Sequence, residues 1–215
     1  MDPTDELETG LTLLRVPAAR STVLHRLVCH HLERQRAPAY WIDARNTAST
    51  HALYECASTP RTLEGLEIAR AFTAYQHHTL VREVARRADA NTGLVVAPNV
   101  ADPYAEVPDW ERAELLAATL VTLRELGRAL ACPVVVTGTD EQALETVAEH
   151  ATTEIRSVQT REGVRLEGER YRTAWYDHGT YWQTTIPYWV EVCGSLEEVV
   201  DPVVVAADWG LVEVA

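Results

Sequence analysis

The sequence contains no lysine, so all 19 of its side-chain cations other than histidine are arginines, set against 32 aspartates and glutamates. This absence excludes Schiff-base chemistry, lysine general bases and the lysine that binds phosphate in P-loop enzymes. The net charge of −13 comes without any basic stripe, which argues against a broad nucleic-acid footprint. An acidic chain with arginine as sole cation is typical of a salt-rich cytoplasm, and we expect a halophilic archaeon; an ordinary acidic protein of a high-GC bacterium is the alternative.

Long apolar runs and paired cysteines are also lacking. No stretch approaches the roughly 20 apolar residues of a membrane span, and the acidic start at residues 1–8 differs from the basic front of a signal peptide. We therefore expect a cytoplasmic protein with no membrane partner. The cysteines stand singly, with no C-x-x-C spacing, and adjacent histidines on a helix point too far apart to share a metal, so we expect reduced cysteines and no metal site. These residues are Cys29, Cys56, Cys132 and Cys193, with the pairs His30–His31 and His77–His78.

The length and composition of the chain are those of one globular domain. A chain of 215 residues with 47% hydrophobic and 24% charged residues can bury a core, and no repeat or Gly/Ser linker divides it. We expect a single domain over residues 1–215, with a core at about 11–160 and a β-rich part at about 152–190.

Two periodicities alternate along most of the chain. Short apolar runs typical of buried strands alternate with helical patterns, and Ser21–Thr22 is expected to cap the first helix. This βα alternation predicts an α/β fold, a mainly parallel sheet with helices on both faces. The expected strands are 11–16, 40–43, 66–72, 93–97 and 133–136, and the expected helices are 21–32, 51–56, 75–87, 109–131 and 141–150.

The final third has a different pattern. Residues 152–159, 164–175 and 181–185 are β-rich, with turn signals at Glu162–Gly163, Glu167–Gly168 and His178–Gly179. We expect these segments to be antiparallel strands that extend the sheet.

Several segments, in order, resemble a known family. The run YWIDARNT at 40–47 resembles the second-strand segment of RecA-type recombinases, especially the archaeal RadA and RadB branch, and IARAFT at 68–73 followed by QHH at 76–78 is similar to a later segment of that branch. LVVAP at 94–98 stands at the position of the Walker B strand, and LREL at 123–126 leading to PVVVT at 133–137 resembles the next helix and strand. The resemblance implies a RecA-like fold over about residues 11–140.

The phosphate-binding loop implied by the resemblance is degenerate. A P-loop, G-x-x-x-x-G-K-[ST], uses glycines to wrap the phosphates, a lysine to contact their oxygens and a hydroxyl to hold Mg²⁺. In the matching stretch, Arg15 and Arg20 replace the glycines and Ser21 replaces the lysine, while Thr22 keeps the hydroxyl. We interpret the arginines as surface ion-pair partners; a retained phosphate contact at the helix start is the alternative.

The other positions of ATP chemistry are also changed. Arg45 stands where the family has the glutamate that activates water, and Pro98 or Asn99 stands at the Walker B acid. Asp102 could replace that acid only with a different loop, and Gly138–Thr139 replaces the family's amide pair. We therefore expect a pseudo-ATPase with no cofactor, that is, neither ATP nor Mg²⁺.

Three functions follow as hypotheses. The favoured one is a non-catalytic RecA-fold paralogue that acts by protein contact in DNA recombination or repair, with a RecA-type ATPase or a second copy, in a homo-oligomer, as partner. A switch protein that binds nucleotide or DNA at Arg15–Thr22 is the second. An unrelated doubly wound α/β enzyme with Asp43, Arg45, Asn99 and Asp102 at its strand ends is the third. Candidate partner contacts are the aromatic residues Trp175, Tyr176, Trp182 and Trp189, for which hairpin packing is the alternative.

Overall fold

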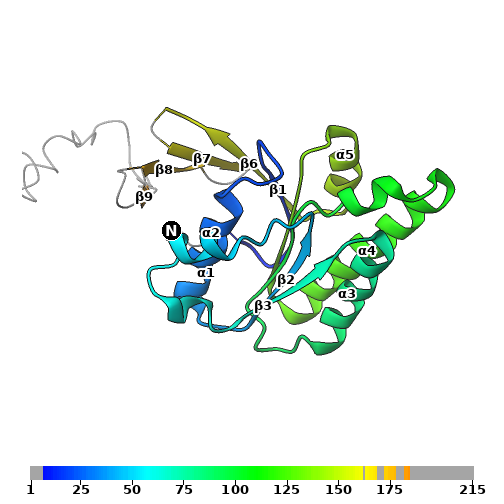
Figure 1. Cartoon of the computed structure of the whole chain (residues 1–215), viewed down its shortest axis with the longest axis horizontal. Coiled ribbons are helices and arrows are strands. Elements are labelled where there is room, and N and C mark those ends of the chain that lie inside the picture. Colours follow the sequence, from blue (N-terminus) through cyan, green and yellow to red (C-terminus); the bar gives the residue numbers. More distant parts are fainter. Residues whose placement is uncertain (1–6, 162, 169–171, 178–181, 185–215) are drawn as a thin grey trace, which may run out of the picture.

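The computed structural model describes residues 7–161, 163–168, 172–177 and 182–184, which form a nine-stranded sheet flanked by helices (Figure 1). The order of strands across the sheet is β3-β2-β4-β5-β1-β6-β7-β8-β9. Neighbours from β3 to β6 run parallel, and neighbours from β6 to β9 run antiparallel. The strands are β1 (Gly10–Arg15), β2 (Ala39–Ala44), β3 (Leu66–Ala71), β4 (Leu94–Ala97), β5 (Pro133–Gly138), β6 (Thr153–Gln159), β7 (Gly163–Gly168), β8 (Arg172–Asp177) and β9 (Trp182–Thr184).

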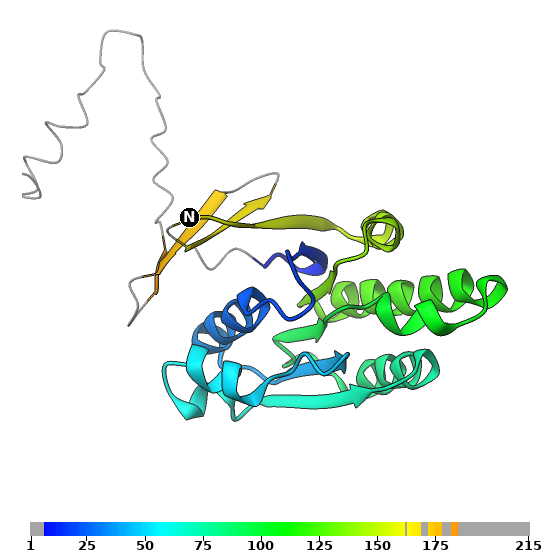
Figure 2. The ribbon, with the colours of Figure 1, turned by 45° about the horizontal axis from the view of Figure 1, so that its top comes forward.

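Helices cover both faces of the parallel part, which confirms the α/β fold that the sequence predicts (Figure 2). Helices α1 and α2 pack on one face, and α3, α4 and α5 pack on the other. The helices are α1 (Val23–Gln35), α2 (Thr50–Cys56), α3 (Ala74–Arg87), α4 (Asp109–Leu130) and α5 (Glu141–His150), with short 3₁₀ helices η1 (Pro60–Leu63) and η2 (Asp102–Glu106).

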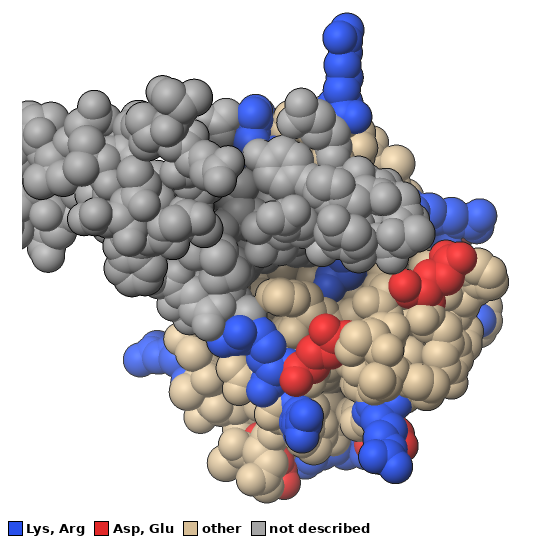
Figure 3. Space-filling model, turned by 90° about the vertical axis from the view of Figure 1, so that its left-hand side faces the viewer, with Lys and Arg blue, Asp and Glu red and all other residues tan. Residues whose placement is uncertain are grey.

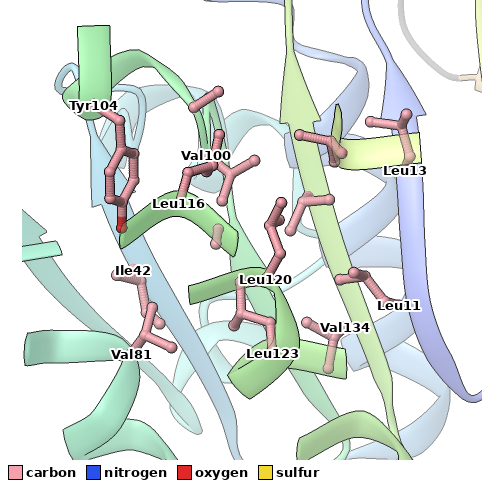
Figure 4. Close-up of a cluster of buried hydrophobic side chains, with 14 of the residues drawn as sticks. Leu11, Leu13, Ile42, Val81, Val100, Tyr104, Leu116, Leu120, Leu123 and Val134 are labelled. Carbon is pink, nitrogen blue, oxygen red and sulfur yellow. The ribbon is translucent and has the colours of Figure 1, made fainter. Parts of the chain in front are cut away.

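The core follows from the two-residue period of the strands. Leu11 and Leu13 of β1 face α4, while Leu14 faces α1, because successive side chains of a strand point to opposite faces. On α4, Leu116, Leu120 and their neighbours form a buried stripe against the sheet (Figure 4). Burial of each such leucine contributes about 2 kcal/mol, so both cores hold the strand ends in a fixed arrangement.

Two local expectations were wrong, and a third is confirmed only in part. Strand β6 was expected to be antiparallel to its neighbours, but it runs parallel to β1. The antiparallel part of the sheet begins with the pairing of β6 and β7. The crossover through α5 returns the chain to the edge next to β1, which requires that parallel direction. The run 164–175 is two strands, β7 and β8, since the turn signal at Glu167–Gly168 ends the first. The cap predicted at Ser21–Thr22 is only partly present: Thr22 is the N-cap but makes no side-chain capping bond, and the Val23 N–H donates to Ser21 Oγ at 3.4 Å.

The acidic excess is unevenly distributed along the chain. Residues 7–161 and 163–168 contain 17 arginines and 20 carboxylates, so most of the net charge of −13 lies in the other residues. On the face in Figure 3, arginine and acidic side chains lie among uncharged ones. Within the described ranges, no helix is both long and apolar enough to cross a membrane.

Candidate functional site

Four parallel strands, β1, β2, β4 and β5, end at one edge of the sheet, and the loops after them carry the candidate residues. In α/β folds ligands bind at this edge, where the chain turns from strands into helices. The degenerate loop, residues 16–22, lies between β1 and α1, as a phosphate-binding loop does. Asn99 follows β4, Arg45 follows β2, and Gly138 ends β5. The fold thus brings the sequence-predicted positions to one edge.

Arg15 is held by acidic side chains of this chain. Its Nε donates to Glu154 Oε1 at 2.6 Å and its Nη1 to Glu141 Oε1 at 3.3 Å. The bond to Glu154 raises the pKa of Arg15, and the side chain is largely buried, 16% exposed. The ion-pair interpretation is confirmed for Arg15, although its nearer partner lies on β6 rather than on a helix. Arg20 is exposed within the loop.

Asn99, one of the two positions at which the resemblance places the metal-binding acid, contacts the degenerate loop directly. Its side-chain Nδ2 donates to the Ala19 carbonyl at 3.2 Å, and its backbone N–H donates to Thr137 Oγ1 of β5 at 3.0 Å. The residue is fully buried and has φ 49°, a left-handed conformation that asparagine tolerates better than most residues. The amide therefore ties loop 16–22 to the end of β4, and its Oδ1 has no partner among the described residues.

Asp43 organises the turn after β2. The fully buried carboxylate accepts the N–H groups of Thr47 and Ala48 and the Thr47 hydroxyl on Oδ1, at 2.7–3.0 Å. Its Oδ2 accepts from Arg70 Nε at 2.8 Å. Both oxygens thus accept hydrogen bonds from the protein itself. The role of Asp43 is therefore structural, and neither oxygen is free for a ligand.

Arg45, which is half-exposed, and Asp102, which is more buried, lie next to each other at this edge. Arg45 has φ 61° and lies 3.9 Å from Asp102 and 3.6 Å from Glu106 of η2. Burial raises the pKa of Asp102, and the positive charge of the neighbouring Arg45 offsets part of this rise. Of the four residues in the enzyme hypothesis, only Arg45 and Asp102 contact each other, since Asp43 and Asn99 are directed to structural partners.

The residues present do not fit a nucleotide with Mg²⁺. Such a ligand requires a carboxylate at the end of β4 and a cation on the loop facing its phosphates, whereas an asparagine amide is bonded to the loop and Arg15 is paired with two glutamates. Within the described ranges, no group of three or more histidine, cysteine, aspartate or glutamate side chains could hold a metal.

Exposed aromatic side chains lie at the end of β3, an edge strand of the described sheet, and at the starts of α3 and α4. Phe72 is 76% exposed, Tyr75 53% and Trp110 80%, and Tyr75 Oη donates to Glu111 Oε2 at 2.9 Å, which joins the starts of α3 and α4. Ile68 on the neighbouring strand β3 is also exposed, and β3 pairs only with β2 in the described sheet. We call Phe72, Tyr75 and Trp110 the aromatic edge.

The sequence analysis missed the aromatic edge and the partners of Asp43 and Asn99. Phe72 matches the resembling segment, but only the fold shows that its ring is exposed. Arg70 and Thr137 are distant in sequence from the residues they bond, so no local signal identifies them. The side chains of Trp175, Tyr176 and Trp182, and the whole of Trp189, lie outside the described part of the chain, as does Cys193.

Comparison with known proteins does not assign the chain to a family. No protein-family model matches the chain, and no curated protein matches it significantly. What is established is therefore the class of fold, an α/β protein with a mainly parallel sheet, and its function has to be argued from the site.

Proposed function

We propose that this chain is a non-catalytic RecA-like protein that acts through protein contacts, as an accessory or regulatory partner of a RecA-type ATPase in DNA recombination or repair. The bond from Asn99 Nδ2 to the Ala19 carbonyl carries the proposal. A side chain that would hold the metal in an ATPase here holds the loop that would wrap the phosphates. In this proposal the strand–loop–helix unit of an ATPase is retained, but hydrogen bonds within the protein replace its contacts to phosphate and metal.

The charges at the edge support the same conclusion. Hydrolysis of ATP by the recombinase mechanism requires a base near the attacking water, and Arg45 at that position cannot accept a proton. Arg15 would have to leave Glu154 and Glu141 to contact a phosphate, which would leave both carboxylates without their cation. Asp102 carries a carboxylate nearby, but it pairs with Arg45.

The aromatic edge supports a protein partner. Tyrosine, tryptophan and other large aromatic side chains anchor protein interfaces, and monomeric proteins rarely expose several of them together. An edge strand such as β3 also presents unpaired backbone N–H and C=O groups that a partner can bind. A RecA-type ATPase or a second copy of this chain could provide such a partner.

Turnover of ATP tests the non-catalytic part. We expect the purified protein in molar KCl to release phosphate from Mg-ATP no faster than buffer. A rate above background that is lost in Asp102→Asn, a change that keeps the size of a partly buried side chain, would overturn the proposal.

Binding to an intact RecA-type ATPase from the same organism tests the partner. Phe72→Ala with Trp110→Ala should weaken binding at least tenfold in a titration, because exposed aromatic anchors contribute 2 kcal/mol or more each when they are central to an interface. Tyr54→Ala, an exposed tyrosine on α2, is the matched control and should bind like the wild type. If the edge variant binds as tightly as the control, the aromatic edge is not the contact.

One observation favours the switch hypothesis as a second candidate. The start of α1 has no acidic residue in its first turn and no side-chain capping bond from Thr22, and Arg20 is exposed beside it. An anion at that place would meet helix N–H groups and one arginine. A nucleotide without hydrolysis is the ligand of this alternative.

A further inference from the structure

A groove of about 390 Å³ lies between α3 and α4, away from the strand-end site. It is lined by His78, Arg82, Ala85 and Arg86 of α3 and by Ala118 and Thr122 of α4. His78, Arg82 and Arg86 are four residues apart, so they form one ridge along α3, with a spacing of about 6 Å between neighbours. We call this feature the α3–α4 groove.

The groove combines cations with an apolar floor. Arg82 makes no ion pair within the described part of the chain, whereas Arg86 pairs with Glu83 in the same helix. His78 donates from Nδ1 to Thr119 Oγ1 at 2.8 Å, because the Thr119 hydroxyl donates its own proton to the Leu115 carbonyl. This bond fixes the His78 ring at the wall of the groove. Ala85 and Ala118 provide methyl groups where longer side chains would fill the space. A ligand that fits has negative charges spaced along it and small aliphatic groups between them.

The chain itself contains such a segment. Residues 191–213 carry six carboxylates and no arginine, and valine, alanine and leucine lie between these acids. Its carboxylates are Glu191, Glu197, Glu198, Asp201, Asp208 and Glu213.

We propose that the α3–α4 groove binds this acidic segment, residues 191–213, through carboxylates on Arg82 and Arg86 and aliphatic side chains on the alanine floor. The inference is independent of the proposed function, because it involves neither the strand-end site nor the aromatic edge.

The length of the chain permits the contact. Glu197, in the middle of the acidic segment, lies 13 residues after the end of β9 at Thr184, and a chain of that length covers roughly 45 Å when extended. The sheet between β9 and β3 is nine strands wide, or roughly 40 Å at a strand spacing of about 4.8 Å. The segment can thus reach α3 from the far edge of the sheet.

Nucleic acid fits the groove less well than a peptide. Glu83 pairs with Arg86 beside the ridge, and Glu125 on α4 lies one turn beyond the groove residue Thr122. A phosphate backbone carries a charge at every nucleotide and would meet these carboxylates, whereas a peptide can place its acids opposite the arginines and its methyl groups opposite the alanines.

Proteolysis of the full-length protein tests the proposal. Endoproteinase Glu-C is used in about 0.2 M KCl, where contact ion pairs are only partly screened, and cleavage after Glu191 is followed by mass spectrometry. Arg82→Glu with Arg86→Glu should raise the rate of this cleavage at least fivefold over the wild type. Arg87→Glu with Arg128→Glu, an equal charge change outside the groove, should not. Circular dichroism checks that each variant is folded.

A charge swap distinguishes a specific contact from a general electrostatic effect. Adding Glu197→Arg and Glu198→Arg to the groove variant should restore the slow cleavage after Glu191. Equal cleavage rates in the wild type and the groove variant would overturn the proposal. A second outcome would also overturn it: a labelled single-stranded oligonucleotide binds the wild type but not the groove variant, while the cleavage rate is the same in both. That result would assign the groove to nucleic acid.

Discussion

At the scale of single residues, buried polar side chains carry the most specific structural roles. Asp43 accepts four hydrogen bonds, and His77, fully buried in α3, donates from Nδ1 to Tyr104 Oη at 2.9 Å. The direction of that bond follows from Thr119: its hydroxyl donates to the Leu115 carbonyl, so it accepts the Tyr104 proton, and Tyr104 in turn accepts from His77. His77 Nε2 then has a lone pair and no partner among the described residues.

Removing the Asp43 carboxylate should destabilise the fold far more than removing its cation. Asp43→Ala leaves the N–H groups of Thr47 and Ala48 without an acceptor, at a cost of about 3 kcal/mol in the free energy of unfolding. Arg70→Ala removes one bond from a side chain that is 40% exposed and should cost about 1 kcal/mol. Denaturant unfolding measures both. Equal losses would mean that the ion pair, and not the turn, is what Asp43 stabilises.

His77 should make the protein sensitive to acid. Burial lowers its pKa to about 4, from about 6.5 in the unfolded chain. The folded state therefore favours the neutral ring, and its full contribution to stability is present above about pH 6.5 and is lost as the pH falls toward 4. In His77→Asn, which does not titrate, the decline of unfolding free energy between pH 6 and 5 should be smaller by about 1.4 kcal/mol per pH unit.

His51→Asn is the control for that measurement, since its ring is 80% exposed. The control should follow the wild-type curve. Burial also lowers the pKa values of His25 and His31, so some acid sensitivity should persist in His77→Asn. An unchanged slope in that variant would show that His77 is not the group that titrates.

At the scale of elements, the sequence alone predicted the order of strands and helices down to α5, because their apolar periods are long and clear. Leu115 to Leu130 recur every three or four residues, and α4 extends over the range that this pattern indicates. The direction of β6 could not be predicted, since it depends on pairing with β1, which is distant in sequence. The division of 164–175 into two strands has a local signal, the turn at Glu167–Gly168 between the paired strands β7 and β8. The candidate edge was predicted by position, but its bonds were not: Asn99 and Ala19 are 80 residues apart.

The bond between Asn99 and Ala19 should control the order of the degenerate loop. In Asn99→Ala the Ala19 carbonyl loses its donor, and we expect amide hydrogens of residues 18–22 to exchange at least threefold faster than in the wild type. The backbone N–H of residue 99 still donates to Thr137, so the end of β4 should keep its exchange rates. Exchange that is unchanged throughout the loop would show that the side-chain bond does not hold it.

At the scale of the whole molecule, the distribution of charge limits how much salt should stabilise the fold. The described core up to residue 168 is almost balanced in charge, so carboxylate repulsion within it is small. Salt should still relieve the repulsion that remains, and the thermal midpoint should rise by a few degrees between 0.1 and 2 M KCl. A falling midpoint would mean that ion pairs such as Arg15 with Glu154 stabilise the fold more than repulsion destabilises it.

The central claim is that the strand-end site binds its own side chains in place of a nucleotide. Its most direct test is the thermal midpoint of the wild type and of Arg20→Ala with and without millimolar Mg-ATP, because a ligand that binds only the folded state raises the midpoint by mass action. Arg20 is exposed, so its removal leaves the fold intact. We predict that Mg-ATP shifts neither midpoint; a rise of several degrees in the wild type that Arg20→Ala loses would show that the site still binds a nucleotide.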